Sequence, residues 1–421
     1  MSLTGAMNAA VSAMQAQSAA LSIISNNLAN VSTTGYKASS ASFSSMLTSG
    51  SSSTSSGGVT VAKSQNILAR GTLVASSVST NIAVDGDGFF AVTTGEGGPV
   101  YYTRNGAFTV DNTTGQLTNN GYSLLGWPTD ADGNVVGGTT ETNLELVDTS
   151  KLAGYAAATT KLSLDGTLPA NASVGDDYTS QLELYDSLGT SYTMNVTWQK
   201  TAENTWSMSF GDLTNSSGTA DSSATVTTTP SPISITFNAD GTLASPESAT
   251  LSISGLSDGA SAMSVALNLG TPNASDGLSQ YTPSSSSTST TVDIACTGNG
   301  CAYGTLSGVT IDTDGTVYGN YSNGESISLY KVPLATFSNA DGLTEMSNSV
   351  YTTSDNTSSA SYHFANSDGV GKIKNSELEE STTDTNTEFS SMIAAQQAYS
   401  GASQVVSTAK SMFDSLLQAV R

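Results

Sequence analysis

The first 36 residues alternate apolar and polar positions with the spacing of an amphipathic helix, and none of them is charged. Apolar residues recur in steps of three and four, as they do along the seam of a coiled coil. Gln17 interrupts the stripe, and alanine, a strong helix former, fills many other positions. The stripe consists of Leu3, Met7, Ala10, Met14, Leu21, Ile24, Leu28 and Val31. The pattern predicts a long N-terminal helix whose apolar face needs a partner.

A second stripe with nearly the same spacing runs along the C-terminal segment. Thr385 and Glu388, just before it, are spaced as in a capping box at a helix start. The stripe consists of Phe389, Met392, Ala395, Tyr399, Ala402, Val406, Ala409, Phe413, Leu416 and Val420. We predict that the two terminal helices pair with each other as a coiled coil. Their near-neutral charge also favours packing against further copies of the chain, because like charges would not oppose it.

The N-terminal stripe ends in Asn-Asn-Leu-Ala-Asn-Val-Ser-Thr-Thr-Gly-Tyr-Lys, residues 26–37. Asn30 suits the left-handed position that follows a helix. Gly35 permits a positive φ. Tyr36 and Lys37, the first charged residue, are expected to anchor the chain where it leaves the helix.

The sequence between the two terminal segments is typical of β structure. Apolar and polar residues alternate from about Val59 onward and break at Asp-Gly and Asn-Gly pairs, which are hairpin signals. Residues 39–58 are rich in serine, threonine and glycine, a composition typical of flexible linkers. Asp-x-Asp-Gly recurs at 85–88, 130–133 and 312–315, but these segments lack the remaining ligands of a calcium loop, so we predict hairpin turns and no metal site.

Charge and composition exclude several function classes. A net charge of −23 with only 12 basic residues argues against nucleic acid and against an anionic membrane surface. No apolar run approaches the length of a membrane span, and no cleaved export signal is apparent. His363 is the only histidine, and no phosphate-binding loop is present, so the sequence predicts neither an enzyme nor a cofactor site. Cys296 and Cys301 fit a local disulfide and a pair of free thiols equally well.

The string at 26–37 closely resembles the N-terminal signature of bacterial flagellar rod and hook proteins. Further blocks follow in that family's order: Ser-Thr-Asn-Ile-Ala-Val-Asp-Gly-Asp-Gly-Phe-Phe at 79–90, the run at 101–128, the late block at 308–351 and the terminal segment at 377–420. Leu-Glu-Leu-Tyr-Asp-Ser-Leu-Gly-Thr at 182–190 and the block at 235–243 resemble elements of the hook members in particular. The residues that carry the N-terminal signature are Asn26, Asn27, Ala29, Asn30, Thr34, Gly35, Tyr36 and Lys37.

This resemblance implies a structural subunit of the flagellar hook, a curved hollow tube that acts as a universal joint outside the cell. It also implies self-assembly, export without a cleaved signal, and contact with the distal rod, the hook cap, the hook–filament junction proteins and the export apparatus. A distal rod protein of the same family and, from a different class, a secreted β-rich adhesin remain alternatives. An adhesin would not need paired helices at both ends.

Together these observations predict an α+β multidomain chain. Helices at 1–36 and 380–421 form an inner domain, and an extended linker occupies 37–69. A mainly antiparallel β domain is built from 70–145 and 292–370. A second β domain, 146–291, is inserted into the first.

Overall fold

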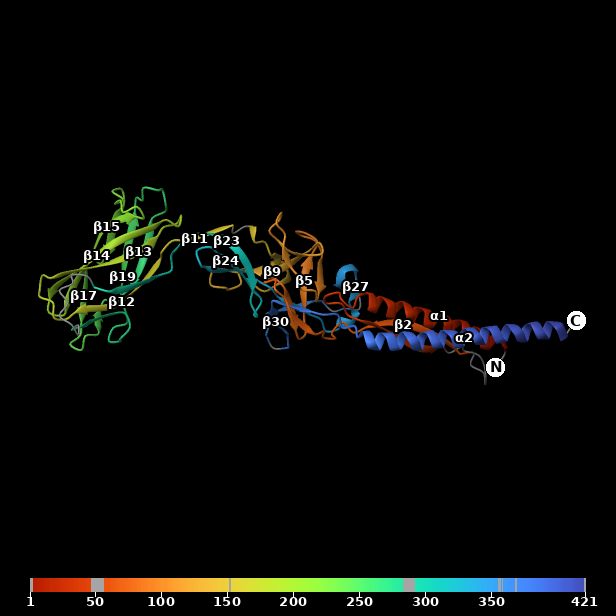
Figure 1. Cartoon of the computed structure of the whole chain (residues 1–421). Helices are drawn as coiled ribbons and strands as arrows, with labels where there is room; N and C mark the ends of the chain where they lie inside the picture. The colour runs from red at the N-terminus through yellow and green to blue at the C-terminus, as the bar shows by residue number, and fades with distance from the viewer. Residues whose placement is uncertain are drawn as a thin grey trace. The chain divides into compact units, whose positions relative to one another are not determined.

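The computed structural model describes residues 3–46, 57–150, 153–282, 292–354, 357, 359–367 and 369–419. The chain forms two compact units. The helical unit comprises Met1–Lys151, Gly308–Gly319 and Ile327–Arg421, and the inserted unit comprises Leu152–Ser307 and Asn320–Ser326. Two long helices and many mainly antiparallel strands, visible in Figure 1, confirm the predicted α+β class.

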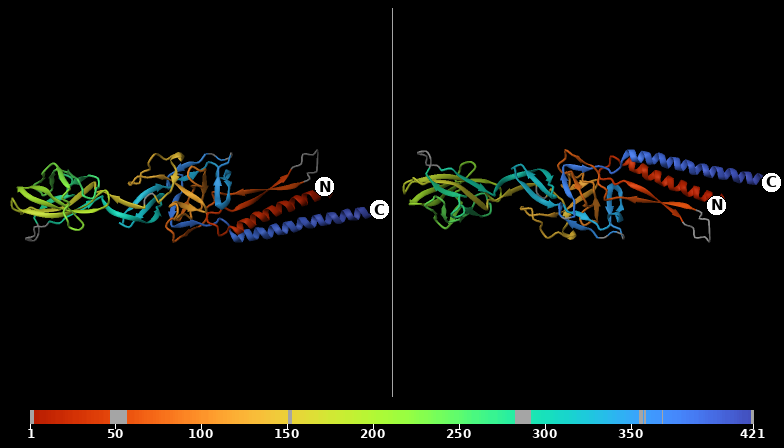
Figure 2. Two further views of the ribbon diagram at one scale, coloured as in Figure 1. Left: turned by 90° about the horizontal axis from the view of Figure 1, so that it is seen from above. Right: turned by 90° about the horizontal axis from the view of Figure 1, so that it is seen from below.

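The two helices of the helical unit are α1 (Leu3–Ala29) and α2 (Thr385–Ala419), and they pack side by side in both views of Figure 2. Asn27, near the end of α1, donates a hydrogen bond to Glu388 in the first turn of α2, so the helices run antiparallel. Each helix places an apolar stripe against its neighbour, which is the physical reason for the pairing.

Two details of the helix ends differ from the sequence prediction. Asp384 caps α2: its Oδ1 accepts hydrogen bonds from the backbone N–H groups of Asn386 (2.8 Å) and Thr387 (3.3 Å). The predicted capping box at Thr385 and Glu388 was therefore wrong by one residue. Asn30 does not adopt a positive φ; the positive φ, +70°, falls on Gly35 instead.

The segment predicted as an extended linker contains a β-hairpin. Strands β1 (Ser39–Met46) and β2 (Gly58–Gln65) pair antiparallel, with Ser39 opposite Gln65 and Met46 opposite Gly58. The hairpin packs along α1, where the Ser12 hydroxyl accepts a hydrogen bond from the Val59 N–H (3.3 Å). The helix supplies the surface that orders a sequence of low intrinsic strand preference.

The remaining strands of the helical unit form a large, mainly antiparallel sheet with two small two-stranded additions. Its core gathers aromatic rings, among them Phe89 and Tyr351, whose centroids lie 6.1 Å apart. The strands are β3 (Leu73–Ala75), β4 (Ile82–Asp85), β5 (Phe89–Thr93), β6 (Val100–Thr103), β7 (Thr109–Val110), β8 (Leu117–Asn119), β9 (Tyr122–Pro128), β10 (Glu145–Leu146), β26 (Leu334–Thr336), β27 (Thr344–Glu345), β28 (Val350–Thr352), β29 (Ser361–His363), β30 (Lys372–Asn375) and β31 (Glu377–Glu379). Strands β3 and β31 pair with each other, as do β4 and β30.

The inserted unit packs a five-stranded sheet, β13-β14-β15-β17-β18, with a six-stranded sheet around one apolar core. Burial alternates along the strands, so one face of each sheet lines the core. Trp198 and Trp206 are fully buried there. The strands of these two sheets are β12 (Lys161–Pro169), β13 (Asp177–Tyr185), β14 (Ser191–Ala202), β15 (Thr205–Asn215), β16 (Thr225–Thr229), β17 (Ile233–Phe237), β18 (Leu243–Ser245), β19 (Ser248–Ser254), β20 (Met263–Asn268), β21 (Leu278–Tyr281) and β22 (Ile294–Gly298). A further strand of the unit, β11 (Gly154–Ala157), lies outside these two sheets.

Three strands, β23 (Cys301–Ile311), β24 (Thr316–Tyr321) and β25 (Ser326–Lys331), carry residues of both units. The inserted unit therefore ends later along the chain than the predicted 146–291, because β22 and the start of β23 return to pair with β12 and β11. No helix in the described part of the chain combines the length and the apolarity needed to cross a membrane.

Candidate functional site

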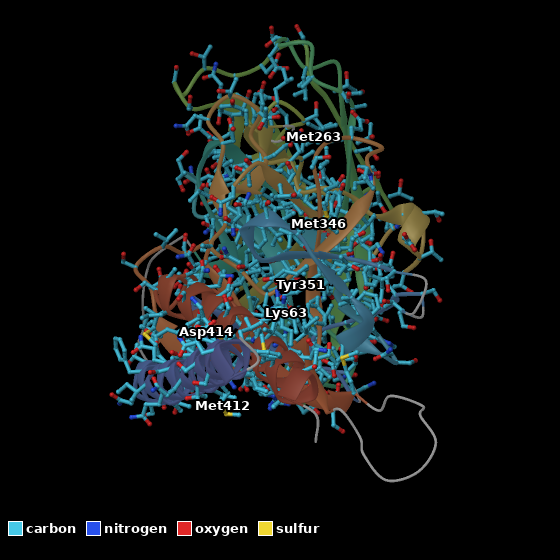
Figure 3. The ribbon with its side chains drawn as sticks, turned by 90° about the vertical axis from the view of Figure 1, so that its right-hand side faces the viewer. Lys63, Met263, Met346, Tyr351, Met412 and Asp414 are labelled. Carbon is cyan, nitrogen blue, oxygen red and sulfur yellow. The ribbon has the colours of Figure 1, made fainter. Side chains whose placement is uncertain are left out.

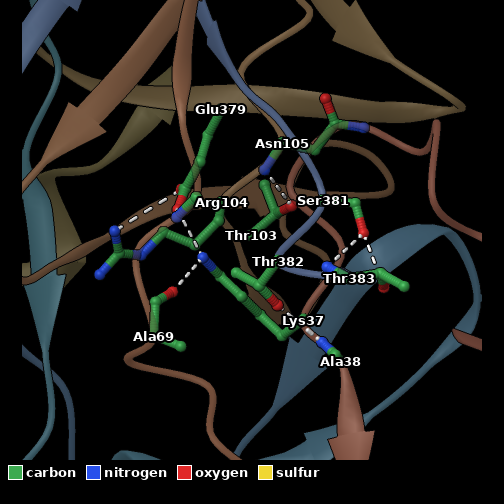
Figure 4. A network of polar contacts seen from close by, with 11 residues as sticks. Lys37, Ala38, Ala69, Thr103, Arg104, Asn105, Glu379, Ser381, Thr382 and Thr383 are labelled. Atoms are coloured by element: carbon green, nitrogen blue, oxygen red, sulfur yellow. Dashed lines mark hydrogen bonds and ion pairs between the residues drawn. The ribbon is translucent and has the colours of Figure 1, made fainter. Parts of the chain in front are cut away.

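The residues of the N-terminal signature surround the point where the chain leaves α1. There they meet β31 and the start of α2, which lie more than 340 residues later in the sequence (|i−j| = 342 for Lys37 and Glu379). We call this region the buried corner and define it by Asn27, Tyr36, Lys37, Arg104 and Glu379. Figure 4 shows the polar contacts of Lys37, Arg104 and Glu379 within it.

Lys37 and Glu379 form a fully buried ion pair at the centre of the corner. The Lys37 ammonium lies 2.5 Å from Glu379 Oε1, and their side chains are 0% and 1% exposed. The ammonium also donates to the Ala69 carbonyl (2.6 Å), and Glu379 Oε1 accepts the Gly71 N–H (2.7 Å). Burial lowers the pKa of Lys37, and the Glu379 carboxylate opposes that shift. Several hydrogen bonds thus offset the cost of removing two charges from water.

Arg104 contributes a second buried cation to the corner. Its Nη1 lies 3.7 Å from Glu379 Oε2, and its guanidinium lies 5.1 Å from the centre of the Phe89 ring. None of its guanidinium nitrogens has a hydrogen-bond partner among the described residues, and burial lowers its pKa. Arg104 is therefore held by charge and by the aromatic face rather than by hydrogen bonds.

Asn27 connects α1 to the hairpin and to α2. Its amide Nδ2 donates to the Ser39 carbonyl and to Glu388 Oε1, both at 2.7 Å. Its Oδ1 accepts the Tyr36 hydroxyl (3.1 Å) and the Ser39 N–H (3.0 Å). One buried side chain thus fixes three chain segments, which gives a physical reason for an asparagine at this place.

Gly35 allows the chain to turn against the segment just after β6 that carries Arg104 and Asn105. Its φ is +70°, and a Cβ added there would lie 2.7 Å from the backbone nitrogen of Asn105. Its N–H donates to the Glu379 carbonyl (2.8 Å). A side chain at position 35 would therefore face both backbone strain and a backbone clash.

We expect Gly35→Ala to lower the free energy of unfolding of the helical unit by about 2–5 kcal/mol, from left-handed strain and overpacking. Gly97→Ala is the matched control, since Gly97 has a φ of +68° and a Cβ added there would meet nothing within 4 Å. It should cost about 1–2 kcal/mol. Hydrogen exchange measured peptide by peptide compares the two, and equal losses would show that the close approach to Asn105 is unimportant.

The structure does not bring every signature residue into the corner. Asn26 and Ala29 are exposed on α1, and Asn30 and Thr34 are half-buried. The Asn30 side-chain amide donates to the Asn26 carbonyl one turn earlier (2.9 Å), and its Oδ1 accepts the Thr33 hydroxyl (3.1 Å). For these four residues, the functional importance implied by the family signature remains a prediction.

Sequence reasoning missed Arg104 and Glu379 as members of the corner. The available signal was an arginine inside an aromatic, apolar run in a chain with only 12 basic residues. A glutamate flanked by other acids at 377–380 gave no signal, because its burial depends on the pairing of β31 with β3.

The apolar stripe of α1 lies against its neighbours. The described members are buried (Ala10, Ile24) or half-buried (Met7, Met14, Leu21, Leu28, Val31), and the side chain of Leu3 lies outside the described residues. The most deeply buried apolar residues of α1, Ala16 and Ala20 at 3% exposure, are not in the predicted stripe. The reason is that α1 packs against the hairpin as well as against α2.

The stripe of α2 is divided between buried and exposed positions. Met392, Ala395, Ala402, Val406 and Ala409 are half-buried or buried. The exposed members of the predicted stripe are Phe389, Tyr399, Phe413 and Leu416, and Val420 lies outside the described residues. Further exposed apolar residues on α2 are Ile393, Val405, Met412 and Leu417. Figure 3 shows Met412 at the outer edge of the helix. The helix thus presents a large apolar surface that the described part of its own chain does not cover.

Cys296 and Cys301 are free thiols, so the disulfide alternative is wrong for this structure. Cys296 lies opposite Leu164 on β12, whereas Cys301 lies opposite Ala157 on β11. The two residues are thus committed to different strand partners. Burial raises the pKa of both thiols, which keeps them protonated and unreactive near neutral pH.

Four family profiles match the chain in order. They are the flagella basal body rod protein (residues 7–37), the flagellar hook protein FlgE/F/G D1 domain (83–167), the flagellar basal body protein FlaE D2 domain (163–293) and the flagellar basal body rod FlgEFG protein C-terminal region (374–419). The flagellar hook protein FlgE of Rhizobium meliloti is 32% identical over 435 residues, with 100% of both chains covered. The chain belongs to the flagellar hook protein family.

Other hook proteins match over nearly the same length. FlgE of Brucella melitensis is 31% identical with 100% of both chains covered, and FlgE of Escherichia coli is 30% identical with 98% and 99% covered. The crystal structure of Helicobacter pylori FlgE2 shares the fold, with a TM-score of 0.50 over 73% of this chain and 100% of that one, at 12% identity. The chain is thus a structural subunit of the flagellar hook and a homopolymeric axial component; the rod alternative is not favoured.

Proposed function

We propose that α1 and α2 form the inner wall of the hook tube by packing against the same helices of neighbouring copies. The observation that carries this proposal is the uncovered apolar surface of α2. Leu416 and Leu417 are 57% and 68% exposed, although both are large and apolar. Burying each such side chain in a neighbouring subunit would contribute about 1.5–3 kcal/mol.

The lengths of the helices explain why this surface stays uncovered within one chain. α1 has 27 residues and α2 has 35, which correspond to about 40 Å and 52 Å at 1.5 Å per residue. Figure 2 shows α2 continuing past the start of α1. The end of α2 that carries Met412, Phe413, Leu416 and Leu417 therefore has no partner among the described residues of its own chain, and a second copy would supply one.

The charges of the helices support dense packing of many copies. α1 contains no charged residue, and α2 contains Glu388, Lys410 and Asp414, hence one net negative charge out of 23. Electrostatic repulsion between copies would thus act between their β domains rather than between their helices. In our proposal, the helices hold the wall, and the acidic β surfaces make weaker contacts that re-form as the tube bends in its role as a universal joint.

The buried corner would transmit force between these layers. Buried polar contacts in the corner fix the end of α1 and the start of α2 to β31 and to the hairpin. We expect α1 and α2 to turn together with the adjacent strands for this reason. Rigid connection of the wall to the β structure is what torque transmission requires.

The family suggests further features that we include in the proposal. The subunit would lie outside the cell, leave it without a cleaved signal, and contact the distal rod, the hook cap, the junction proteins and the export apparatus. We assign it no catalytic step and no cofactor; its single histidine, His363, is exposed on β29.

Electron microscopy of basal bodies from a strain with this gene deleted in frame tests the assignment. Complete rods without hooks or filaments are the expected result. Bodies that stop within the rod would place the subunit in the rod, and intact flagella would contradict a required role in the axial structure.

A further inference from the structure

Two aspartates meet in the inserted unit, at a place that none of the assembly contacts discussed above uses. Asp186 belongs to the turn between β13 and β14, and Asp258 to the loop between β19 and β20. A hydrogen bond between their carboxyl groups is among the causes that shift both pKa values, so the two groups face each other. The first pair of strands belongs to the five-stranded sheet and the second to the six-stranded sheet, so this contact joins the two sheets.

Asp186 is completely buried, and only one of its two carboxyl oxygens accepts a hydrogen bond from a described residue. Its Oδ1 accepts the N–H groups of Leu188 (2.8 Å) and Thr190 (2.9 Å), which shape the turn. Its Oδ2 is buried and accepts no hydrogen bond from any described group. A buried carboxylate oxygen without a donor is costly, whereas a protonated one can itself donate.

Asp258 offers the matching acceptor. Its Oδ2 accepts the Tyr192 hydroxyl (3.0 Å), and its Oδ1 accepts the Ala260 N–H (2.9 Å). These donors stabilise the charged form of Asp258. A second bond, from the Ser261 N–H to the Ser187 hydroxyl (3.1 Å), connects the same turn and loop.

No positive charge compensates the pair. Neither carboxylate takes part in an ion pair within the described part of the chain. Among the described residues, the other titratable groups at this place are Tyr192 and Asp221. The pKa of Tyr192 is raised by burial, then by Asp258, Asp186 and Asp221, and Asp221 accepts hydrogen bonds from the Ser257 N–H and hydroxyl (both 2.9 Å). Two charged carboxylates in contact, with a third nearby, would repel each other strongly.

We propose that Asp186 and Asp258 bind one proton between them, and that this proton holds the two sheets of the inserted unit together at this end. Asp186 carries the proton and donates a hydrogen bond through it to the Asp258 carboxylate. A divalent cation fits less well, because calcium takes six to eight oxygen ligands. The described residues contain no cluster of three or more aspartate, glutamate, histidine or cysteine side chains suited to a metal.

The direction of the pH dependence follows from the two pKa values. Burial raises the pKa of Asp186, and the hydrogen bond from Asp186 lowers the pKa of Asp258. Above the ordinary aspartate pKa the unfolded chain has released the proton that the folded unit retains, so stability falls as pH rises until Asp186 also ionises. Below that pKa the unfolded chain binds both protons whereas the folded pair binds one, so stability also falls as pH drops until Asp258 is protonated, and the pair stabilises the unit most near the ordinary aspartate pKa.

The test uses the full chain in a Trp127→Phe background, so that fluorescence reports Trp198 and Trp206 of the inserted unit. Asp186→Asn keeps the shape, and its amide can donate to Asp258 at every pH. The ratio of the unfolding constant of the parent to that of Asp186→Asn, measured in urea, should rise by up to tenfold per pH unit above about pH 4. Asp212→Asn, at an exposed position on β15, removes a charge elsewhere and should follow the parent.

A constant ratio for Asp186→Asn would overturn the proposal. So would stabilisation of the parent, but not of Asp186→Asn, by calcium at pH 8, since a cation would then occupy the site. If Asp186→Asn fails to fold, the infrared spectrum of the parent chain decides: a protonated carboxyl band that persists above the ordinary aspartate pKa of about 3.9 is expected, and a band that disappears at that pKa contradicts a shared proton.

Discussion

Lys37→Met should lower the free energy of unfolding of the helical unit by about 3–5 kcal/mol, because it leaves the buried Glu379 carboxylate without its main partner. Arg104 compensates only in part, since it lies 3.7 Å away and makes no hydrogen bond among the described residues. The Ala69 carbonyl also loses its donor. Hydrogen exchange of peptides that contain β30 and β31 measures the loss within this unit.

Lys63→Met is the matched control for this substitution. Lys63 lies 2.7 Å from Glu345, but its side chain is 53% exposed, so water already solvates the pair. Its loss should cost less than about 1 kcal/mol. Similar losses for the two variants would show that burial does not make the Lys37–Glu379 pair special, and the buried corner would lose its structural role.

Leu416→Asp should abolish hook assembly and leave the subunit folded. Leu416 is 57% exposed, so an aspartate there stays solvated in the free chain. In the tube, the same aspartate would be buried against an apolar neighbour, at a cost of several kcal/mol for each subunit added. Electron microscopy of polymers from purified subunits, together with the circular dichroism of the monomer, separates assembly from folding.

Ser411→Asp introduces the same charge on α2 as a control. Ser411 is exposed and lies five residues before Leu416, about 140° around the helix. It should permit assembly. Normal tubes from Leu416→Asp, or equal loss of assembly from both variants, would contradict packing through the apolar end of α2.

The sequence predicted the elements of this fold where local physics decides them. Apolar residues at steps of three and four gave both helices, and the period-two alternation from Val59 onward gave the β structure. Backbone sterics made Gly35 identifiable as a turn residue, and its φ of +70° agrees. The hairpin of β1 and β2 was not predicted, because its serine-rich strands depend on α1 for a surface to pack on.

Only the N-terminal part of the candidate site was predictable from the sequence. The signature at 26–37 supplied Asn27, Tyr36 and Lys37, but not the two charges that complete the corner. The capping of α2 by Asp384 shows the same limit on a smaller scale, since Glu388 is engaged by Asn27 of another helix and does not cap its own.

By itself, the sequence determined the paired terminal helices, the β-rich middle and the concentration of acidic charge between the helices, because helical period, strand period and charge are properties of neighbouring residues. Only the tertiary structure decided that Lys37 meets Glu379, that Asp186 meets Asp258, and which apolar residues of α2 remain uncovered. These contacts join positions separated by tens or hundreds of residues. Their free energy depends on burial, which no local pattern specifies before the chain has folded.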